Sequence, residues 1–193
     1  LYHNQFEIDD EFIETFANHT NQQIRYMTDT IDNFMGFFDP NKVKEKFLLK
    51  DAIDDSITLL DKLLIQNNTI IELNISDENL FGVKDELIQV LINLISNSHD
   101  AFLENEIENN KIIITSKLEN DCISLSLEDN AGGISKNVIK DIFNPYFTTK
   151  QHGTGTGLYM VNLIITSSFK GNIQVYNTNT NGVKFVLEFP VKI

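Results

Sequence analysis

The chain has 193 residues, of which 41% are hydrophobic, enough for one well-buried domain with an extension but short for two full domains. Its 28 acidic residues against 15 Lys and Arg give a formal charge of −13, which would repel a phosphate backbone and argues against nucleic acid as a partner. The single cysteine, Cys122, excludes an internal disulfide and is consistent with a reducing compartment.

No apolar run reaches the roughly 18 residues that a membrane span needs, and the N-terminus lacks the basic start and apolar stretch of a signal peptide. The sequence begins at Leu1 rather than Met, which suggests a part of a longer protein. We therefore expect this part to be cytoplasmic, while the parent protein could be bound to a membrane through other segments.

Residues 9–38 contain no proline, and apolar side chains recur along their second half at steps of three and four, which predicts a long helix. This apolar seam consists of Ile24, Met27, Ile31, Phe34 and Phe38. Pro40 ends the helix, because proline lacks the amide donor and restricts the residue before it. We predict a boundary there, between residues 1–40 and a domain of residues 41–193.

Beyond Pro40 the apolar pattern switches several times between the helical period and the strand period. Helices are predicted at 49–65, 85–103, 138–143 and 158–168. Strands are predicted at 69–75, 111–118, 122–127, 172–176 and 183–189. This order predicts an α+β fold in which helices cover one face of a mixed, largely antiparallel sheet, as a two-layer α/β sandwich preceded by a long N-terminal helix.

Five of the nine glycines lie in two short segments, 132–133 and 153–157. Glycine lets backbone amides approach a ligand closely and adopt positive φ, so the second segment, just before the 158–168 helix, could cradle phosphates. A flexible surface loop explains that segment equally well.

One face of the 85–103 helix is polar. It carries Gln89, Asn93, Asn97 and Asp100, spaced three or four apart. Asparagine offers a neutral carbonyl oxygen that suits a hard cation such as Mg²⁺ already bound to phosphates. Considered alone, however, this helix is better explained as having a solvated face.

Asp129 follows a predicted strand and directly precedes the glycines at 132–133. Its carboxylate could accept a hydrogen bond from an adenine amino group, or simply begin a turn.

Farther along the chain, an aromatic hinge around Pro145 is followed by two hydroxyls and one cation, although the aromatic rings could equally fill the core. The hinge consists of Phe143, Tyr146, Phe147, Thr148, Thr149 and Lys150.

These four segments, in this order, resemble the conserved boxes of the histidine-kinase ATPase family, also called GHKL or HATPase. Residues 89–101 resemble its N box, 129–134 its G1 box, 142–150 its F box and 153–158 its G2 box. The resemblance covers roughly residues 45–193.

The resemblance implies a Bergerat-type site for ATP and Mg²⁺. In it, Asn97 would coordinate Mg²⁺ and Asp129 would bind the adenine amino group. Asn93 would lie close to the phosphates and Lys150 could reach toward them, so these two are predicted to act in catalysis. The other implied nucleotide-binding residues are Asp100, Ala131, Gly133, Ile134, Phe147, Thr148, Thr149, Gly153, Thr154, Gly155, Thr156, Gly157 and Leu158.

The chain departs from the family pattern in two places. Ala131 stands where the G1 box usually has glycine, and we expect this to be tolerated because Gly132 and Gly133 keep the turn open. Val183 and Lys184 stand where threonine is frequent, which leaves the hydrogen bonding around Asp129 open.

Hydrolases with the same nucleotide fold, such as DNA gyrase and MutL, resemble this chain at 97–101 but carry a glutamate one turn before the magnesium asparagine. That glutamate activates water. Here Asn93 holds the position, and an amide is neither a base nor ionisable. The sequence therefore predicts a protein-histidine kinase that transfers the γ-phosphoryl group to a histidine. An ATPase that couples hydrolysis to dimer closure is the alternative.

The four histidines are His3, His19, His99 and His152. Only His19 is predicted on a helix outside the ATP domain, and it lacks the acidic residue that directly follows the family's acceptor histidine. Residues 23–40 resemble the end of the second dimerisation helix, so we expect the acceptor helix to be missing from this chain. The chain should then bind Mg-ATP without phosphorylating itself. Because the acceptor is absent, a third hypothesis is a non-catalytic docking module in which the glycine-rich lid only becomes ordered when nucleotide binds.

The resemblance also implies the partners. They are ATP, the acceptor histidine on the missing dimerisation helix, and the receiver domain of a response regulator. The apolar seam of residues 24–38 further predicts a homodimer through the N-terminal helix.

Overall fold

A computed structural model describes residues 42–150 and 153–191, together with Ile13, Phe16, Ala17 and Thr20. The chain divides into two compact units, Leu1–Asn41 and Lys42–Ile193. Within the first unit, the four described residues are helical. The predicted seam of residues 24–38 lies outside the described residues, so its role in dimerisation stays a prediction.

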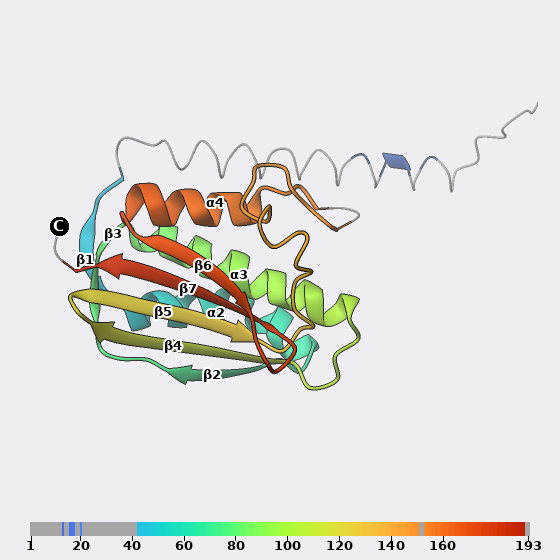
Figure 1. Ribbon diagram of the computed structural model, residues 1–193, viewed down its shortest axis with the longest axis horizontal. Coiled ribbons are helices and arrows are strands. Elements are labelled where there is room, and N and C mark those ends of the chain that lie inside the picture. Colours follow the sequence, from blue (N-terminus) through green and yellow to red (C-terminus); the bar gives the residue numbers. More distant parts are fainter. Residues whose placement is uncertain (1–12, 14–15, 18–19, 21–41, 151–152, 192–193) are drawn as a thin grey trace, which may run out of the picture. The chain divides into compact units, whose positions relative to one another are not determined.

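A five-stranded mixed sheet forms one layer of the second unit, in the order β2-β4-β5-β7-β6 (Figure 1). Its strands are β2 (Ile70–Asn74), β4 (Lys111–Glu119), β5 (Cys122–Asp129), β7 (Val183–Pro190) and β6 (Asn172–Asn177). β2 runs parallel to β4, and the other neighbours are antiparallel. Every second residue of β7 is buried, which is the burial expected when one sheet face is covered. The predicted mixed, largely antiparallel sheet is confirmed.

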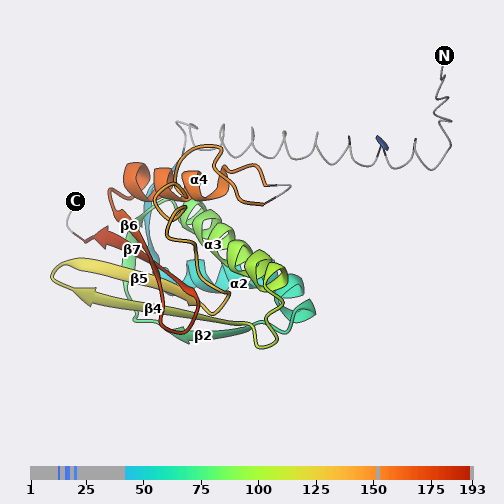
Figure 2. The same ribbon diagram turned by 45° about the vertical axis from the view of Figure 1, so that its right-hand side comes forward.

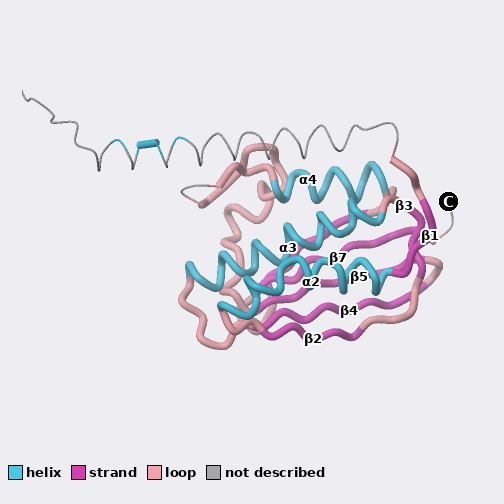
Figure 3. The backbone as a smooth tube through the Cα atoms, turned by 180° about the vertical axis from the view of Figure 1, so that it is seen from behind, coloured by secondary structure: helices cyan, strands magenta, loops and turns pink. Residues whose placement is uncertain are grey.

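Helices form the second layer and cover one face of the sheet (Figure 3). They are α2 (Leu49–Gln66), α3 (Lys84–Glu104) and α4 (Gly157–Leu163), the last continuing into a π-helical turn, η1 (Ile164–Ser168). α3 packs against both α2 and α4 and lies between them (Figure 2). The predicted two-layer sandwich is therefore confirmed.

The core lies between α3 and the sheet. Fully buried side chains from α3 and from the central strands meet there, and they include Leu87, Leu91, Leu94, Ile112, Ile114 and Leu125. At the edge of this layer, Lys84 Nζ lies 2.7 Å from Asp55 Oδ2 and ties α3 to α2. The hydrogen bond to Asp55 raises the pKa of Lys84 above its ordinary value. The burial of α3 fixes the position of its polar stripe.

Two strands were not predicted. β1 (Glu45–Leu48) and β3 (Asn79–Gly82) pair antiparallel in a separate two-stranded sheet. β1 buries only Phe47, so it shows no alternation that sequence periodicity could detect.

The helix predicted at 138–143 is wrong. Residues 136–143 instead form successive turns, in which the N–H of Val138 bonds to the carbonyl of Ser135 and that of Asp141 to Val138. Pro145 disfavours helical geometry in the residue before it, and a short helix is stable only when tertiary packing supports it.

Candidate nucleotide site

Asp129, the last residue of β5, is buried at the end of the sheet with only 5% of its surface exposed. Its Oδ1 accepts hydrogen bonds from the N–H of Ala131 at 3.0 Å and the N–H of Val183 at 2.9 Å. Its Oδ2 accepts one from the Ser98 hydroxyl at 2.7 Å. A carboxylate oxygen has two lone pairs, so Oδ1 is saturated and Oδ2 keeps one free acceptor direction.

The departure at Val183 therefore does not leave Asp129 without support. The backbone N–H of Val183 donates to the carboxylate, and any residue except proline supplies that group. This approach requires Gly182, because a Cβ there would overlap the carbonyl oxygen of Asp129.

The turn after Asp129 uses both of its glycines at positive φ, +106° at Gly132 and +79° at Gly133. Such angles favour glycine strongly. Ala131 is buried and is not among the residues with positive φ, so its methyl group is accommodated as expected. The N–H of Gly132 donates to the carbonyl of Asn181 at 2.8 Å, which ties the turn to the β6–β7 hairpin.

The polar stripe of α3 faces the start of α4. Asn93 Nδ2 donates to the carbonyl of Gln89 at 3.0 Å within the helix, which leaves Oδ1 as the free end of the amide. A Cβ on Gly157 would lie 3.0 Å from that Oδ1, so the first residue of α4 closely approaches Asn93. The segments predicted as the N and G2 boxes are thus adjacent.

Lys150 joins the predicted F box to the same stripe. Its Nζ donates to Asn97 Oδ1 at 3.0 Å and to Asp100 Oδ2 at 2.6 Å. Asn97 is half-buried and Asp100 is exposed. A cation thus lies against the oxygen that was predicted to hold Mg²⁺.

These residues suit a hard cation that shares its ligands with a nucleotide. Asn97 and Asp100 supply oxygen donors, which Mg²⁺ prefers, and the ammonium of Lys150 already occupies a cation position beside them. No group of three or more His, Cys, Asp or Glu that could hold a metal occurs among residues 42–150 and 153–191. Magnesium usually keeps several waters and shares its site with substrate phosphates, so it does not need such a cluster.

The glycine-rich segment folds back on the aromatic hinge. Gly155 has φ of +65°, and a Cβ there would overlap the backbone at Tyr146. Tyr146 is 78% exposed, so it does not fill the core. The hydroxyls of Thr154 and Thr156 lie 2.7 Å apart and bond to each other.

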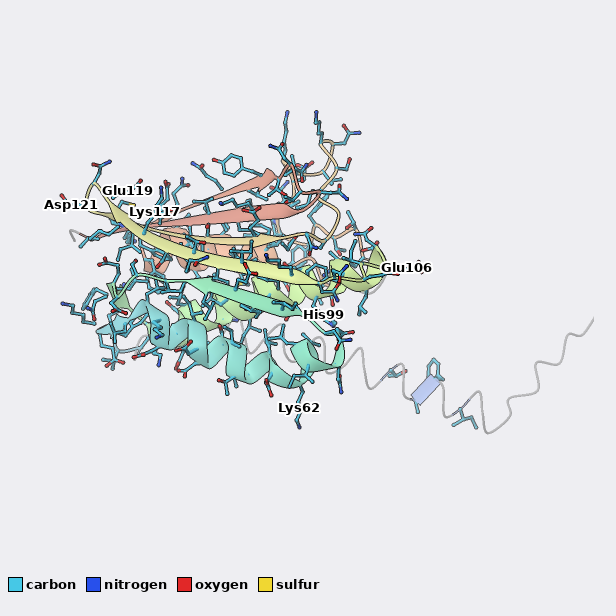
Figure 4. The ribbon with its side chains drawn as sticks, turned by 90° about the horizontal axis from the view of Figure 1, so that it is seen from below. Lys62, His99, Glu106, Lys117, Glu119 and Asp121 are labelled. Carbon is cyan, nitrogen blue, oxygen red and sulfur yellow. The ribbon has the colours of Figure 1, made fainter. Side chains whose placement is uncertain are left out.

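The remaining predicted site residues are less closely joined. Phe147 and Leu158 are half-buried, and Thr148 and Thr149 are exposed. Ile134 has its backbone N–H and carbonyl bonded to the side chain of Asn177. His99 is buried inside the domain, which agrees with a structural role for it (Figure 4).

Three residues that contact the site were missed from the sequence. Ser98 supports Asp129, Asn105 donates to the carbonyl of Ala131 at 2.7 Å, and Asn177 bonds to Ile134. For Ser98 a signal existed, because it lies on the buried side of α3 directly after Asn97. For Asn105 and Asn177 the sequence held no such signal.

A five-stranded sheet with one helical layer, and a buried carboxylate beside a glycine turn, is the arrangement expected of the predicted nucleotide-binding domain. Residues 82–193 match the family described as histidine kinase-, DNA gyrase B-, and HSP90-like ATPase. The chain belongs to this family, and it is an ATP-binding catalytic domain of the sensor histidine kinase type.

Named relatives agree with this assignment. Sporulation kinase A of Bacillus subtilis (strain 168) is 32% identical over 154 residues, which are 79% of this chain and 25% of that protein. The catalytic domain of the histidine kinase ThkA superposes with a TM-score of 0.68 at 31% identity, over 77% of this chain and 95% of that one. ThkA in complex with the response regulator TrrA gives a TM-score of 0.72 at 24% identity, over 97% of this chain and 54% of that one.

The chain spans about a quarter of the length of the curated relatives that it matches. In the part of the chain that the structure describes, no helix is both long and apolar enough to cross a membrane.

Proposed function

We propose that this domain supplies the phosphoryl-transfer step of a sensor histidine kinase. It binds Mg-ATP and passes the γ-phosphoryl group to a histidine outside the described domain. A nitrogen of that imidazole attacks the γ-phosphorus, the bond to the bridging oxygen breaks, and ADP leaves. The observation that carries this proposal is Asn93, a non-ionisable amide beside Gly157, at the position where a hydrolase needs a base.

For the nucleotide base, the free acceptor direction on Asp129 Oδ2 fits the adenine amino group. Burial of the carboxylate strengthens such a hydrogen bond, because little water competes for it. The three donors that already hold Asp129 keep the acceptor in place before the nucleotide arrives.

For the phosphates, Asn97 would hold Mg²⁺ through Oδ1, and the ion when bound would neutralise charge on the phosphate oxygens. Lys150 would then leave Asn97 Oδ1, because two cations cannot share that oxygen closely. Its ammonium becomes free to contact the phosphates, while Asp100 keeps it near the site. The same lysine would thus serve both the nucleotide-free and the nucleotide-bound state.

We further propose the partners of this domain. The acceptor histidine would lie on a dimerisation helix outside the chain, and the seam of residues 24–38 would form a homodimer. The next acceptor would be the receiver domain of a response regulator. The complex of ThkA with the response regulator TrrA supports this expectation by fold similarity.

The test is phosphotransfer in a longer chain of the same protein that includes its acceptor helix. With labelled Mg-ATP we expect acid-labile, base-stable phosphate on histidine. Replacing Asn97 with alanine should lower this transfer about a hundredfold or more, because it removes the metal ligand. Steady phosphate release with no labelled histidine would favour the ATPase alternative. The absence of both phosphate release and labelled histidine would favour a docking module.

Lys150→Gln tests the proposed role of the lysine. We expect phosphotransfer to fall about thirtyfold, because one cation aimed at the phosphates is lost. The Mg²⁺ concentration that gives half-maximal phosphotransfer should also fall, since the Lys150 ammonium no longer competes for Asn97 Oδ1. Titrating Mg²⁺ at fixed ATP measures both effects. Lys140→Gln, at an exposed lysine of the turns before Pro145, is the matched control and should behave like the wild type.

A further inference from the structure

Side-chain amides hold the turn of residues 131–134 that follows Asp129. Asn177 is the last residue of β6, and its side chain forms two hydrogen bonds with Ile134. Its Oδ1 accepts the N–H of Ile134 at 2.7 Å, and its Nδ2 donates to the carbonyl of Ile134 at 2.7 Å. The side-chain amide therefore pairs with one residue through a donor and an acceptor, as a neighbouring strand would.

A second asparagine holds the other end of the turn. Asn105, the C-cap residue directly after α3, donates from Nδ2 to the carbonyl of Ala131 at 2.7 Å. The turn leaves no room for side chains at its centre. A Cβ on Gly132 would lie 2.8 Å from Asn105 Nδ2, and one on Gly133 would lie 3.2 Å from Asn177 Oδ1. Both amides thus approach the turn closely because glycine occupies these two positions.

The hydrogen bonds of the two asparagines also affect the carboxylate of Asp129, which is proposed to bind adenine. The N–H of Ala131, inside the turn, is one of the two donors to Asp129 Oδ1. A turn with two adjacent glycines loses much conformational entropy when it is ordered, so with only the backbone bond from Gly132 to Asn181 it would be freer to move than with both asparagine side chains in place. Movement of the turn would carry the Ala131 donor away from Asp129.

We propose that Asn105 and Asn177 are positioning residues that set the preference of the site for adenine over guanine nucleotides. This inference rests on the proposed function. Adenine carries an amino donor where guanine carries a carbonyl oxygen, which an ionised carboxylate repels. Discrimination is strong only when Asp129 Oδ2 is fixed, because a mobile carboxylate can retreat from the guanine oxygen. The two asparagines fix it through the turn.

The test compares the affinities of Mg-ADP and Mg-GDP for the 193-residue chain by titration calorimetry. In Asn177→Ala we expect ADP to bind about tenfold more weakly and GDP to change less than about twofold, so that the preference falls about fivefold or more. Asn105→Ala should act in the same direction from the other side of the turn. Asn179→Ala is the matched control, an exposed residue of the same hairpin with no side-chain hydrogen bond among the described residues.

Asn177→Asp separates the paired amide from a simple turn former. Aspartate keeps an acceptor for the N–H of Ile134 but places a second oxygen against its carbonyl, so we expect a loss at least as large as in Asn177→Ala. Wild-type preference in Asn177→Asp, or in both alanine variants, overturns the inference while leaving the proposed function intact. A wild-type chain that binds neither nucleotide overturns both.

Amide hydrogen exchange at Ile134 tests its hydrogen bond to Asn177 directly, even if a variant has a lower melting temperature. In the wild type we expect this N–H to exchange slowly, and in folded Asn177→Ala to exchange about tenfold faster or more, because its acceptor is gone. Fast exchange at Ile134 in the wild type contradicts the proposal.

Discussion

Replacing Asp129 with asparagine is expected to weaken the binding of Mg-ADP about a hundredfold, or about 2.7 kcal/mol. The amide oxygen must face the N–H groups of Ala131 and Val183, since an NH₂ group there would oppose two donors. The NH₂ group therefore takes the place of Oδ2. That position held the free acceptor, and in the variant it presents a donor to the donor of adenine.

Titration calorimetry with Mg-ADP measures this loss, and thermal melting shows whether the variant is folded. Asp121→Asn is the control, because Asp121 lies in the β4–β5 hairpin at the opposite end of the sheet (Figure 4). It should bind Mg-ADP like the wild type. If Asp129→Asn binds Mg-ADP with the affinity of the wild type, Asp129 does not bind the adenine base. The turn that follows it would then not belong to the base site either.

The long periodic segments of this fold could be predicted from the sequence. α3 and the strands β4, β5 and β7 each bury one face, and burial imposes a period that the sequence displays. β1 and β3 could not be found in this way. They contain four residues each, and their pairing joins segments more than 30 residues apart, from Glu45 to Gly82.

The fold explains why the predicted boxes lie close together. The hydrogen bonds between them, however, could not be predicted from any single box. The sequence placed Asn93, Asn97 and Asp100 on one helical stripe, and the structure adds that Lys150 bonds to two of them. That pairing depends on the path of the chain on both sides of Pro145, and before it the predicted helix at 138–143 proved to be turns. Local periodicity carries no information about such a path.

The supporting side chains were hidden for a related reason. Ser98 and Asp129 are 31 residues apart, and Ile134 and Asn177 are 43 residues apart. Serine and asparagine are common in turns and at helix ends, so neither type marks a site by itself. Their roles become visible only when β5, α3 and the β6–β7 hairpin come together at one end of the sheet.

The departure at Val183 shows how backbone geometry can replace a missing side chain. A threonine near this position would offer a hydroxyl, but the carboxylate of Asp129 is already supported by the N–H of Val183. What the site requires instead is a close approach of two backbones. Gly182 provides it, because only a residue without Cβ fits against the carbonyl of Asp129.

Gly182→Ala should therefore damage both stability and binding. The added Cβ would overlap the carbonyl oxygen of Asp129 and lie 2.8 Å from Asn130 Cα, so backbone rather than a flexible side chain would have to move. We expect a loss of about 3 kcal/mol of unfolding free energy, or a melting temperature lower by about 9 °C. In the protein that remains folded, the N–H of Val183 would be displaced from Asp129, and Mg-ADP should bind at least about tenfold more weakly.

Gly153→Ala is the matched control for this prediction. Its Cβ would meet the Thr148 hydroxyl, which can rotate away, and would lie 3.2 Å from Lys150 Cβ, which needs to move by only a few tenths of an ångström, so its melting temperature should fall by less than about 2 °C. Thermal melting followed by calorimetry on the folded protein measures both quantities in each variant. If Gly182→Ala has the same melting temperature as Gly153→Ala and binds Mg-ADP like the wild type, the close approach of Gly182 to Asp129 is wrong. A loss of stability with unchanged affinity would instead mean that Val183 does not position the carboxylate.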